Sequence, residues 1–217
     1  MARRLNYEIP GIDWRLPYEA GEGSAPDWSA HFGSDAALVV EIGFGGGDFL
    51  MELAGQSPET PHLGIEYSAK RALKLARRLA RSELQNVRLV QARAEEVVAN
   101  ALPSESVASF WINFPDPWPK KRHFKRRLIQ PEFVALLARR LVPRGMLEIA
   151  TDHSAYAEWI DEILRNAQGL VNLHAPRPWR PDAPPGRKPT AYELKWRALG
   201  RSFHFFSYQR VAGAPAP

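Results

Sequence analysis

The sequence of 217 residues contains no cysteine. This absence excludes disulfide bonds and thiolate metal sites, and it is typical of proteins that work in a reducing compartment such as the cytoplasm. Long hydrophobic runs are also missing, since no stretch approaches the roughly 18 consecutive apolar residues that a membrane-spanning helix needs. No apolar segment follows the arginines near the start, so we expect no secretory signal. These absences predict a cytoplasmic protein without a membrane segment.

Positive charge, in contrast, is present in excess. Lysine and arginine together number 29 against 24 acidic residues, which gives a formal net charge of +5. This balance favours a polyanionic partner, but many proteins are mildly basic and the net charge alone decides little. The positions of the basic residues are more informative.

We interpret the chain as one domain preceded by an arm. Residues 1–35 are rich in glycine, proline and isolated aromatic residues, so we expect an irregular N-terminal arm. Residues 36–217 are long enough for a single core, and in them apolar runs alternate with segments of helical periodicity. The expected strands are 37–44, 62–66, 86–92, 107–114, 146–151 and 203–211, and the expected helices are 48–55, 69–82, 94–101, 131–141 and 154–167.

This alternation predicts an α/β fold with a mostly parallel, doubly wound sheet. No clear helix precedes the last strand, which we therefore expect to be antiparallel. The segment 175–190 contains six prolines and is expected to form a long loop. In a sheet of this kind, ligands bind beyond the carboxyl ends of the strands.

A glycine-rich turn follows the first expected strand, in the motif EIGFGGGDF at residues 41–49. Glycines such as Gly43 and Gly45 permit a tight turn and let backbone N–H groups approach a ligand closely. Glu66 ends the second strand, where a carboxylate can bind both hydroxyls of a ribose. The pattern fits either a dinucleotide or S-adenosylmethionine.

Two acidic residues favour S-adenosylmethionine. Asp48 stands where a dinucleotide fingerprint has its third glycine, and an acid at a helix N-terminus would repel a pyrophosphate. Glu41 directly precedes the turn, and a carboxylate there suits the ammonium and sulfonium groups of S-adenosylmethionine. We therefore predict an S-adenosylmethionine site.

The motif FPDPWPKKRHFKRR at residues 114–127 follows the fourth strand. Its three prolines restrict the backbone on both sides of Asp116, which suits rigid presentation of a polar group beside a cofactor. Phe114 or Trp118 is a candidate for stacking on a planar base. Six basic residues with the density expected for phosphate contacts follow: Lys120, Lys121, Arg122, Lys125, Arg126 and Arg127. A second basic group, on the helix at 69–82, is interpreted as a solvated face.

Together with GIE (64–66), ATDHSAYAEW (150–159) and TAYELK (190–195), these motifs resemble the tRNA (guanine-N7)-methyltransferase family over about residues 38–210. The resemblance implies a Rossmann-like class I methyltransferase fold, with seven strands and an antiparallel C-terminal strand. It also implies S-adenosylmethionine as methyl donor and guanine 46 in the tRNA variable loop as acceptor, giving 7-methylguanosine. Asp116 matches the catalytic position. The positions matched to the cofactor are Glu41, Gly43, Gly45, Glu66, Arg93 and Asp116. Those matched to tRNA are Lys120, Asp152, Thr190, Ala191, Tyr192 and Glu193.

The resemblance has one notable departure. Arg93 stands where the family commonly has Asp or Asn, so either its side chain or its backbone is left to contact the adenine. Phe124 replaces a common histidine. Asp152 also fits a helix N-cap, a role that Ser154 fills equally well. No metal is expected, because His123 has no second ligand at a suitable spacing.

The sequence is less compatible with two other functions. A nicotinamide-dependent dehydrogenase is disfavoured by Asp48 and by the lack of an obvious catalytic His or Tyr–Lys pair. A tRNA-binding chaperone on a methyltransferase fold would need a degenerate cofactor site. Arg93 is the only residue that favours such a site. Guanine N7 has no proton to lose, so Asp116 is expected mainly to orient the base, or else to stabilise the positive charge that develops. Both a monomer and a homodimer are compatible with the sequence.

Overall fold

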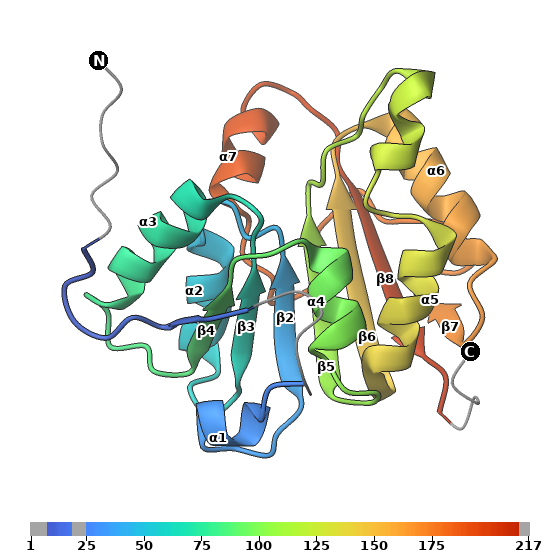
Figure 1. Ribbon diagram of the computed structural model, residues 1–217. Helices are drawn as coiled ribbons and strands as arrows, with labels where there is room; N and C mark the ends of the chain where they lie inside the picture. Colours follow the sequence, from blue (N-terminus) through green and yellow to red (C-terminus); the bar gives the residue numbers. More distant parts are fainter. Residues whose placement is uncertain (1–7, 19–24, 213–217) are drawn as a thin grey trace.

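The computed structural model describes residues 8–18 and 25–212. Eight strands form one sheet in the order β1-β4-β3-β2-β5-β6-β8-β7 (Figure 1). Among the described strands, β8 alone runs opposite to the other seven, and it pairs antiparallel with both β6 and β7. The strands are β1 (Arg15–Leu16), β2 (Leu38–Ile42), β3 (His62–Ile65), β4 (Val87–Val90), β5 (Val107–Asn113), β6 (Leu141–Thr151), β7 (Leu170–Asn172) and β8 (His204–Arg210).

This topology confirms the predicted α/β class and the antiparallel C-terminal strand. The expected number of seven strands is exceeded by one among the described residues. The short edge strand β1 pairs in parallel with β4, through Arg15 opposite Leu89 and Leu16 opposite Val90. The helices are α1 (Trp28–Phe32), α2 (Asp48–Gln56), α3 (Ala69–Leu79), α4 (Ala94–Asn100), the 3₁₀ helix η1 (Lys121–Arg126), α5 (Pro131–Arg140), α6 (Ser154–Arg165) and α7 (Ala191–Arg197).

The expected irregular arm therefore contains two regular elements, β1 and α1, although residues 1–7 and 19–24 lie outside the described part of the chain. Helix α1 begins because the Asp27 side chain accepts a hydrogen bond from the Ala30 N–H, and it ends at Gly33 with φ of 65°. Its buried Trp28 donates a hydrogen bond of 2.8 Å to the Ala101 carbonyl. The arm is thus attached to the domain by a specific buried contact.

Two layers of helices enclose the sheet. Apolar side chains of α4, α5 and α6 pack on one face of the central strands, while α2 and α3 pack on β3 and β4 from the other side. Gly64 in β3 faces α2, and a Cβ atom there would lie 2.6 Å from Leu50 and 2.8 Å from Phe44. Only glycine permits this close approach of helix to strand.

The parallel strands β2 to β6 all end at the same edge of the sheet, near α7 and η1 (Figure 1). The turns and side chains that follow these ends are therefore brought together, as the strand order predicts. No helix in the described part of the chain has the length and apolar character needed to cross a membrane.

Candidate active site

Two adjoining hollows, of about 320 and 540 Å³, open at the carboxyl edge of the sheet. Both are lined by Gly43, Arg71, Asn113, Phe114, Pro115 and Asp116. The smaller one continues toward Glu66 and Arg93. The larger one continues over the glycine turn toward Asp152 and the start of α7. The fold thus joins most of the predicted cofactor and substrate residues around one space, whereas Lys120 and Glu193 line neither hollow.

The glycine turn presents an open surface to the larger hollow. Gly43 and Gly45 have φ of 73° and 54°, a region that favours glycine. Among the described residues, a Cβ atom at Gly43 would meet nothing within 4 Å, and one at Gly45 would meet only the Gly43 carbonyl at 3.9 Å. The turn therefore leaves room for a ligand against its backbone. Gly47 differs, because a Cβ atom there would lie 2.8 Å from Leu75 Cγ in α3.

Glu66 fixes this turn from the end of β3. Its Oε2 accepts a hydrogen bond of 3.0 Å from the Gly45 N–H, and its Oε1 accepts one of 2.9 Å from the Ser68 N–H. The Arg71 guanidinium lies 3.7 Å from Oε2. Each carboxylate oxygen retains a further lone pair, so Glu66 can still accept hydrogen bonds from ribose hydroxyls.

Glu41 is the second buried acid of the site, with 2% of its surface exposed. Its Oε1 accepts a hydrogen bond of 3.2 Å from the Asn113 amide, and the Leu50 backbone N–H at the start of α2 also favours its charged form. Its buried Oε2 has no well-formed hydrogen bond to any described residue. Burial raises the pKa of Glu41 to about 7, against the opposing effects of Asn113 and the Arg187 guanidinium. A buried carboxylate that lines a cavity fits a ligand that brings a cation, as S-adenosylmethionine does.

Arg93 lies at the N-terminus of α4, on the smaller hollow. Its side chain is 59% exposed and lies 3.6 Å from Glu95 and 3.8 Å from Glu96. Exposed pairs of this length contribute little stability, so the arginine is free to rearrange around a ligand. Arg93 and Ala94 both line this hollow.

The loop that carries Asp116 is held in an unusual backbone conformation. Phe114 and Trp118, each followed by proline, have φ of 54° and 43°. Such conformations cost on the order of 1–3 kcal/mol each and persist only where surrounding contacts maintain them. The Phe114 ring packs 5.0 Å from Tyr192 and 5.6 Å from Phe203, so it is engaged with protein aromatics. Asp116 is exposed and lines both hollows.

Arg127 makes one of the contacts that maintain the Asp116 loop. Its position corrects the prediction that all six basic residues of the cluster contact phosphates. Arg127 is only 3% exposed, its Nε donates a hydrogen bond of 2.9 Å to the Pro117 carbonyl, and its guanidinium lies 3.7 Å from the centre of the Phe124 ring. The Arg127 side chain therefore stabilises the loop and is not available to bind a phosphate. The other basic residues of this cluster are exposed: Lys120, Lys121, Arg122, Lys125 and Arg126.

Asp152 lies at the rim of the larger hollow. Its Oδ2 accepts a hydrogen bond of 3.0 Å from the Tyr192 hydroxyl and also pairs with Arg201. The alternative role as a helix cap is wrong, since His153 caps α6 by accepting a hydrogen bond of 3.3 Å from the Tyr156 N–H. Asp152 is therefore oriented toward the site by contacts from the C-terminal segment.

Helix α7 forms the opposite wall of the larger hollow. Thr190 caps it by accepting a hydrogen bond of 3.0 Å from the Glu193 N–H, and Ala191 and Tyr192 face the hollow. Glu193 departs from its predicted role in tRNA binding. Its side chain is 2% exposed and pairs with Arg187 at 2.6 Å, so it contacts no substrate in this arrangement.

Sequence reasoning missed several residues of the site. Asn113 carries a weak signal, because it is a polar residue at the carboxyl end of a predicted strand, where ligands bind. Arg187 lies in a proline-rich loop, and nothing in the surrounding sequence indicates that its side chain is buried. Arg71 belongs to neither predicted basic group, yet it lines both hollows. Within the described residues no cluster of acidic and histidine side chains could hold a metal ion.

The glycine turn, the two buried acids and the mostly parallel sheet define a class I methyltransferase. Solved structures agree on the fold: the 16S rRNA methyltransferase KamB matches with a TM-score of 0.62 at 15% identity, covering 87% of this chain and 95% of its own. The aminoglycoside resistance methyltransferase NpmB1 matches with a TM-score of 0.57 at 20% identity, covering 85% and 92%.

Sequence comparison defines the family. The family model described as "Putative methyltransferase" matches residues 35–206. A tRNA (guanine-N(7)-)-methyltransferase of Halorhodospira halophila is 40% identical over 93% of this chain and 87% of its own length. Another, from Chromohalobacter salexigens, is 41% identical over 91% and 80%. The chain belongs to the tRNA (guanine-N7)-methyltransferase family, whose members are enzymes that use S-adenosylmethionine.

Proposed function

We propose that this protein transfers a methyl group from S-adenosylmethionine to N7 of guanine 46 in the variable loop of tRNA. The relatives that share most of its length bear the name of this activity. The observation that carries the proposal is one continuous space, in which the glycine turn and the acids Glu41 and Glu66 adjoin Asp116. A tRNA substrate implies that the enzyme works in the cytoplasm.

The cofactor would lie along the glycine turn between the two buried acids. Glu66 would accept hydrogen bonds from the ribose hydroxyls, and Arg93 and Ala94, which line the same hollow, would contact the adenine. Glu41, which lines the larger hollow, would offer its carboxylate to the positively charged methionine end. When bound, S-adenosylmethionine supplies an electrophilic methyl group, which the N7 lone pair takes as the carbon–sulfur bond breaks and S-adenosylhomocysteine leaves.

Asp116 would act on the guanine. N7 carries no proton, so the reaction needs alignment and not a general base. A fixed carboxylate can accept hydrogen bonds from the guanine N1–H and amino group, which orients N7 toward the cofactor. Its negative charge also offsets the positive charge that the ring acquires. We assign orientation as its main role, because the proline-flanked loop restricts its position.

The tRNA would approach over the exposed basic cluster and α7. Lys120 and its neighbours on η1 supply positive charge beside the Asp116 loop, which suits contacts with phosphates. Asp152, Thr190 and Tyr192 line the opposite side of the larger hollow. A base that enters this space must first leave its stack.

The test is incubation of unmodified tRNA with methyl-labelled S-adenosylmethionine, followed by nucleoside analysis. We expect labelled 7-methylguanosine, and none when position 46 of the tRNA is changed from guanosine to adenosine. A different labelled nucleoside would contradict the assigned acceptor. Calorimetry with S-adenosylhomocysteine and with NAD separates the other functions: binding of NAD alone would indicate a dehydrogenase, and binding of neither would indicate an RNA-binding protein without a cofactor.

A further inference from the structure

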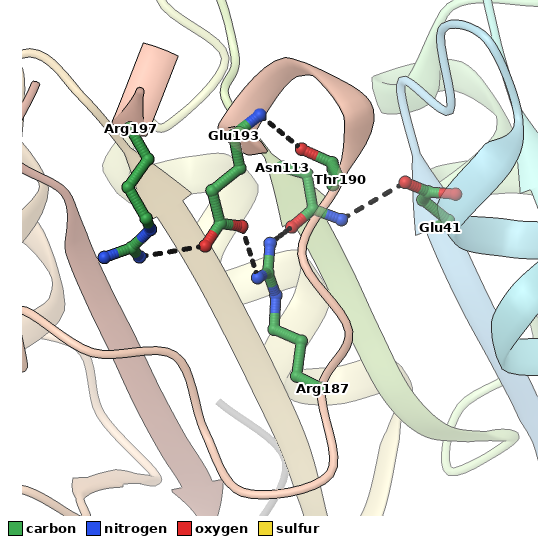
Figure 2. A network of polar contacts seen from close by, with 6 residues as sticks. All are labelled: Glu41, Asn113, Arg187, Thr190, Glu193 and Arg197. Atoms are coloured by element: carbon green, nitrogen blue, oxygen red, sulfur yellow. Dashed lines mark hydrogen bonds and ion pairs between the residues drawn. The ribbon is translucent and has the colours of Figure 1, made fainter. Parts of the chain in front are cut away.

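Arg187 is the centre of a buried polar network, in which Glu41, Asn113 and Thr190 line the larger hollow (Figure 2). Its Nη1 donates a hydrogen bond of 2.6 Å to Glu193 Oε2, and its Nη2 donates one of 2.9 Å to Asn113 Oδ1. The Asn113 amide in turn donates one of 3.2 Å to Glu41 Oε1. Arg197 pairs with the second oxygen of Glu193 at 3.0 Å. A continuous chain of hydrogen bonds therefore joins α7 to the cofactor acid Glu41.

The position of Arg187 is fixed by burial as well as by hydrogen bonds. Its side chain is 2% exposed, and its guanidinium lies 5.3 Å from the centre of the Phe49 ring and 5.0 Å from that of Phe205. Phe49 belongs to the first turn of α2, directly after the glycine turn, and Phe205 belongs to β8. Any displacement of Arg187 would therefore disturb both the cofactor side and the C-terminal side of the site.

Charge explains why an arginine is required here. A buried guanidinium is stable only when its donors are paired, and Arg187 serves two acceptors at once through its planar fork. It also lies close enough to the buried acids Glu41 and Glu148 to favour their charged forms. A lysine, with a single charged atom, cannot serve Glu193 and Asn113 in the same geometry.

The two ends of the network act on different partners of the proposed reaction. At one end, Glu193 holds α7, whose residues Thr190 and Tyr192 line the side of the hollow assigned to tRNA. At the other end, Asn113 orients Glu41, a buried acid that lines the same hollow. A rigid connection of this kind lets a change at one end alter the stability of the other.

We propose that Arg187 is a positioning residue that couples binding at Glu41 to the order of helix α7. This inference rests on the proposed function, because it takes Glu41 as a contact of the cofactor. Cofactor binding then restricts the side chains of Glu41 and Asn113 to one conformation, and Arg187 transmits this restriction to Glu193. The wall that receives tRNA becomes ordered when the methyl donor is in place.

The test combines calorimetry and hydrogen–deuterium exchange, with S-adenosylhomocysteine as the probe. In the wild type, we expect the probe to slow amide exchange in α7. In Arg187→Gln, we expect probe affinity to fall about tenfold, within the usual range for coupled sites, and the protection of α7 to be lost even at saturation. The matched control is Lys188→Gln, the next residue, which pairs with Glu52 on the surface and should behave as wild type.

Thermal unfolding shows whether Arg187→Gln is folded. If it is not, Asn113→Ala decides the matter, since it removes the middle link and should likewise abolish the protection of α7. Wild-type affinity and protection in a folded variant of either kind would overturn the coupling. A wild-type protein that binds the probe without protecting α7 would overturn it while leaving the proposed function intact. Failure of the wild type to bind the probe would overturn both.

Discussion

The backbone N–H of Gly45 donates a hydrogen bond of 3.0 Å to the carboxylate of Glu66. The bond joins the turn after β2 to the end of β3, so the two halves of the cofactor cradle form one unit. The other carboxylate oxygen of Glu66 accepts from the Ser68 N–H at the start of α3. Glu66 therefore shapes the cradle in addition to its proposed contact with a ribose.

Glu66→Gln should weaken cofactor binding through both of these roles. An amide side chain has one acceptor oxygen, so it can satisfy either Gly45 or Ser68 but leaves the other N–H facing its own NH₂ group. We expect the affinity for S-adenosylhomocysteine to fall at least tenfold by calorimetry, and the Gly45 amide to exchange faster. Glu95→Gln, an exposed residue of the same hollow, is the control. Equal affinities for the two variants would contradict this role of Glu66.

Cofactor affinity should depend on pH through Glu41. Burial raises the pKa of this carboxyl from 4.5 to about 7, so in the free protein it is largely neutral below pH 7 and charged above it. A cationic ligand favours the charged form, so binding should strengthen as the pH rises from about 5.5 to 7.5, by no more than tenfold per unit. Calorimetry at constant ionic strength measures this dependence.

Glu41→Gln provides the control for that pH dependence. Glu148 also has a pKa raised to about 7 by burial, and it remains in this variant. We expect weaker binding that no longer changes with pH over the same interval. A variant that retains the wild-type profile would assign the dependence to Glu148 and would remove Glu41 as the titrating group.

The sequence predicts those residues of the site that lie at strand ends, because the order of the strands is enough to bring them together. Glu41, Glu66 and Asp152 each stand at the carboxyl end of a recognisable strand or directly after one, and parallel strands end at a common edge. The glycine turn is predictable for the same reason, since its residues are adjacent in sequence. The fold class follows from the alternation of strands and helices.

The parts that escaped prediction depend on tertiary packing. Arg126 and Arg127 are neighbours of the same type, yet one is exposed and the other is buried under the Asp116 loop. Nothing in their local pattern distinguishes them. Glu193 matches a motif position for tRNA binding, but the distant Arg187 holds it in the interior. Strand β1 has only two residues and forms through pairing with the sheet edge.

Asp116→Asn should separate chemistry from cofactor binding. Asparagine preserves the shape of the side chain but removes the charge and one acceptor. We expect the affinity for S-adenosylhomocysteine to stay within about twofold of wild type and single-turnover methylation of tRNA to fall about 100-fold or more, as for the loss of a fixed group at a reacting centre. Wild-type turnover would exclude Asp116 from the mechanism.

A tRNA with inosine at position 46 tests whether Asp116 orients the base. Inosine lacks the exocyclic amino group of guanosine, so it removes one of the hydrogen bonds assigned to Asp116. If orientation is the main role, inosine should slow the wild type strongly and slow Asp116→Asn much less. Equal effects on the two proteins would favour charge stabilisation.

The basic cluster should divide into two functions. Arg127→Ala should lower the free energy of unfolding by about 2–3 kcal/mol, because it removes buried packing and leaves the Pro117 carbonyl without its donor. Lys120→Ala, at an exposed position, should leave stability unchanged, weaken tRNA binding and reduce its salt dependence by about one unit in the log–log slope. Denaturant unfolding and binding titrations at several salt concentrations measure the two effects. A loss of stability in Lys120→Ala, with unchanged stability in Arg127→Ala, would contradict the structure.

Gly47→Ala should destabilise the fold through a steric clash with α3. Gly47 has φ of 78°, and an added Cβ atom would lie 2.5 Å from Leu75 Cδ2 and 2.8 Å from its Cγ. Gly200 has nearly the same φ, 77°, with nothing within 4 Å of the added atom, so Gly200→Ala measures the backbone strain alone. That strain should cost about 1 kcal/mol in either variant. Overpacking against Leu75 should add about 2 kcal/mol to Gly47→Ala, which at this chain length lowers the melting temperature by about 4–8 °C more than the control. Equal melting temperatures would show that Leu75 can move aside and that the glycine is required there only for its backbone conformation.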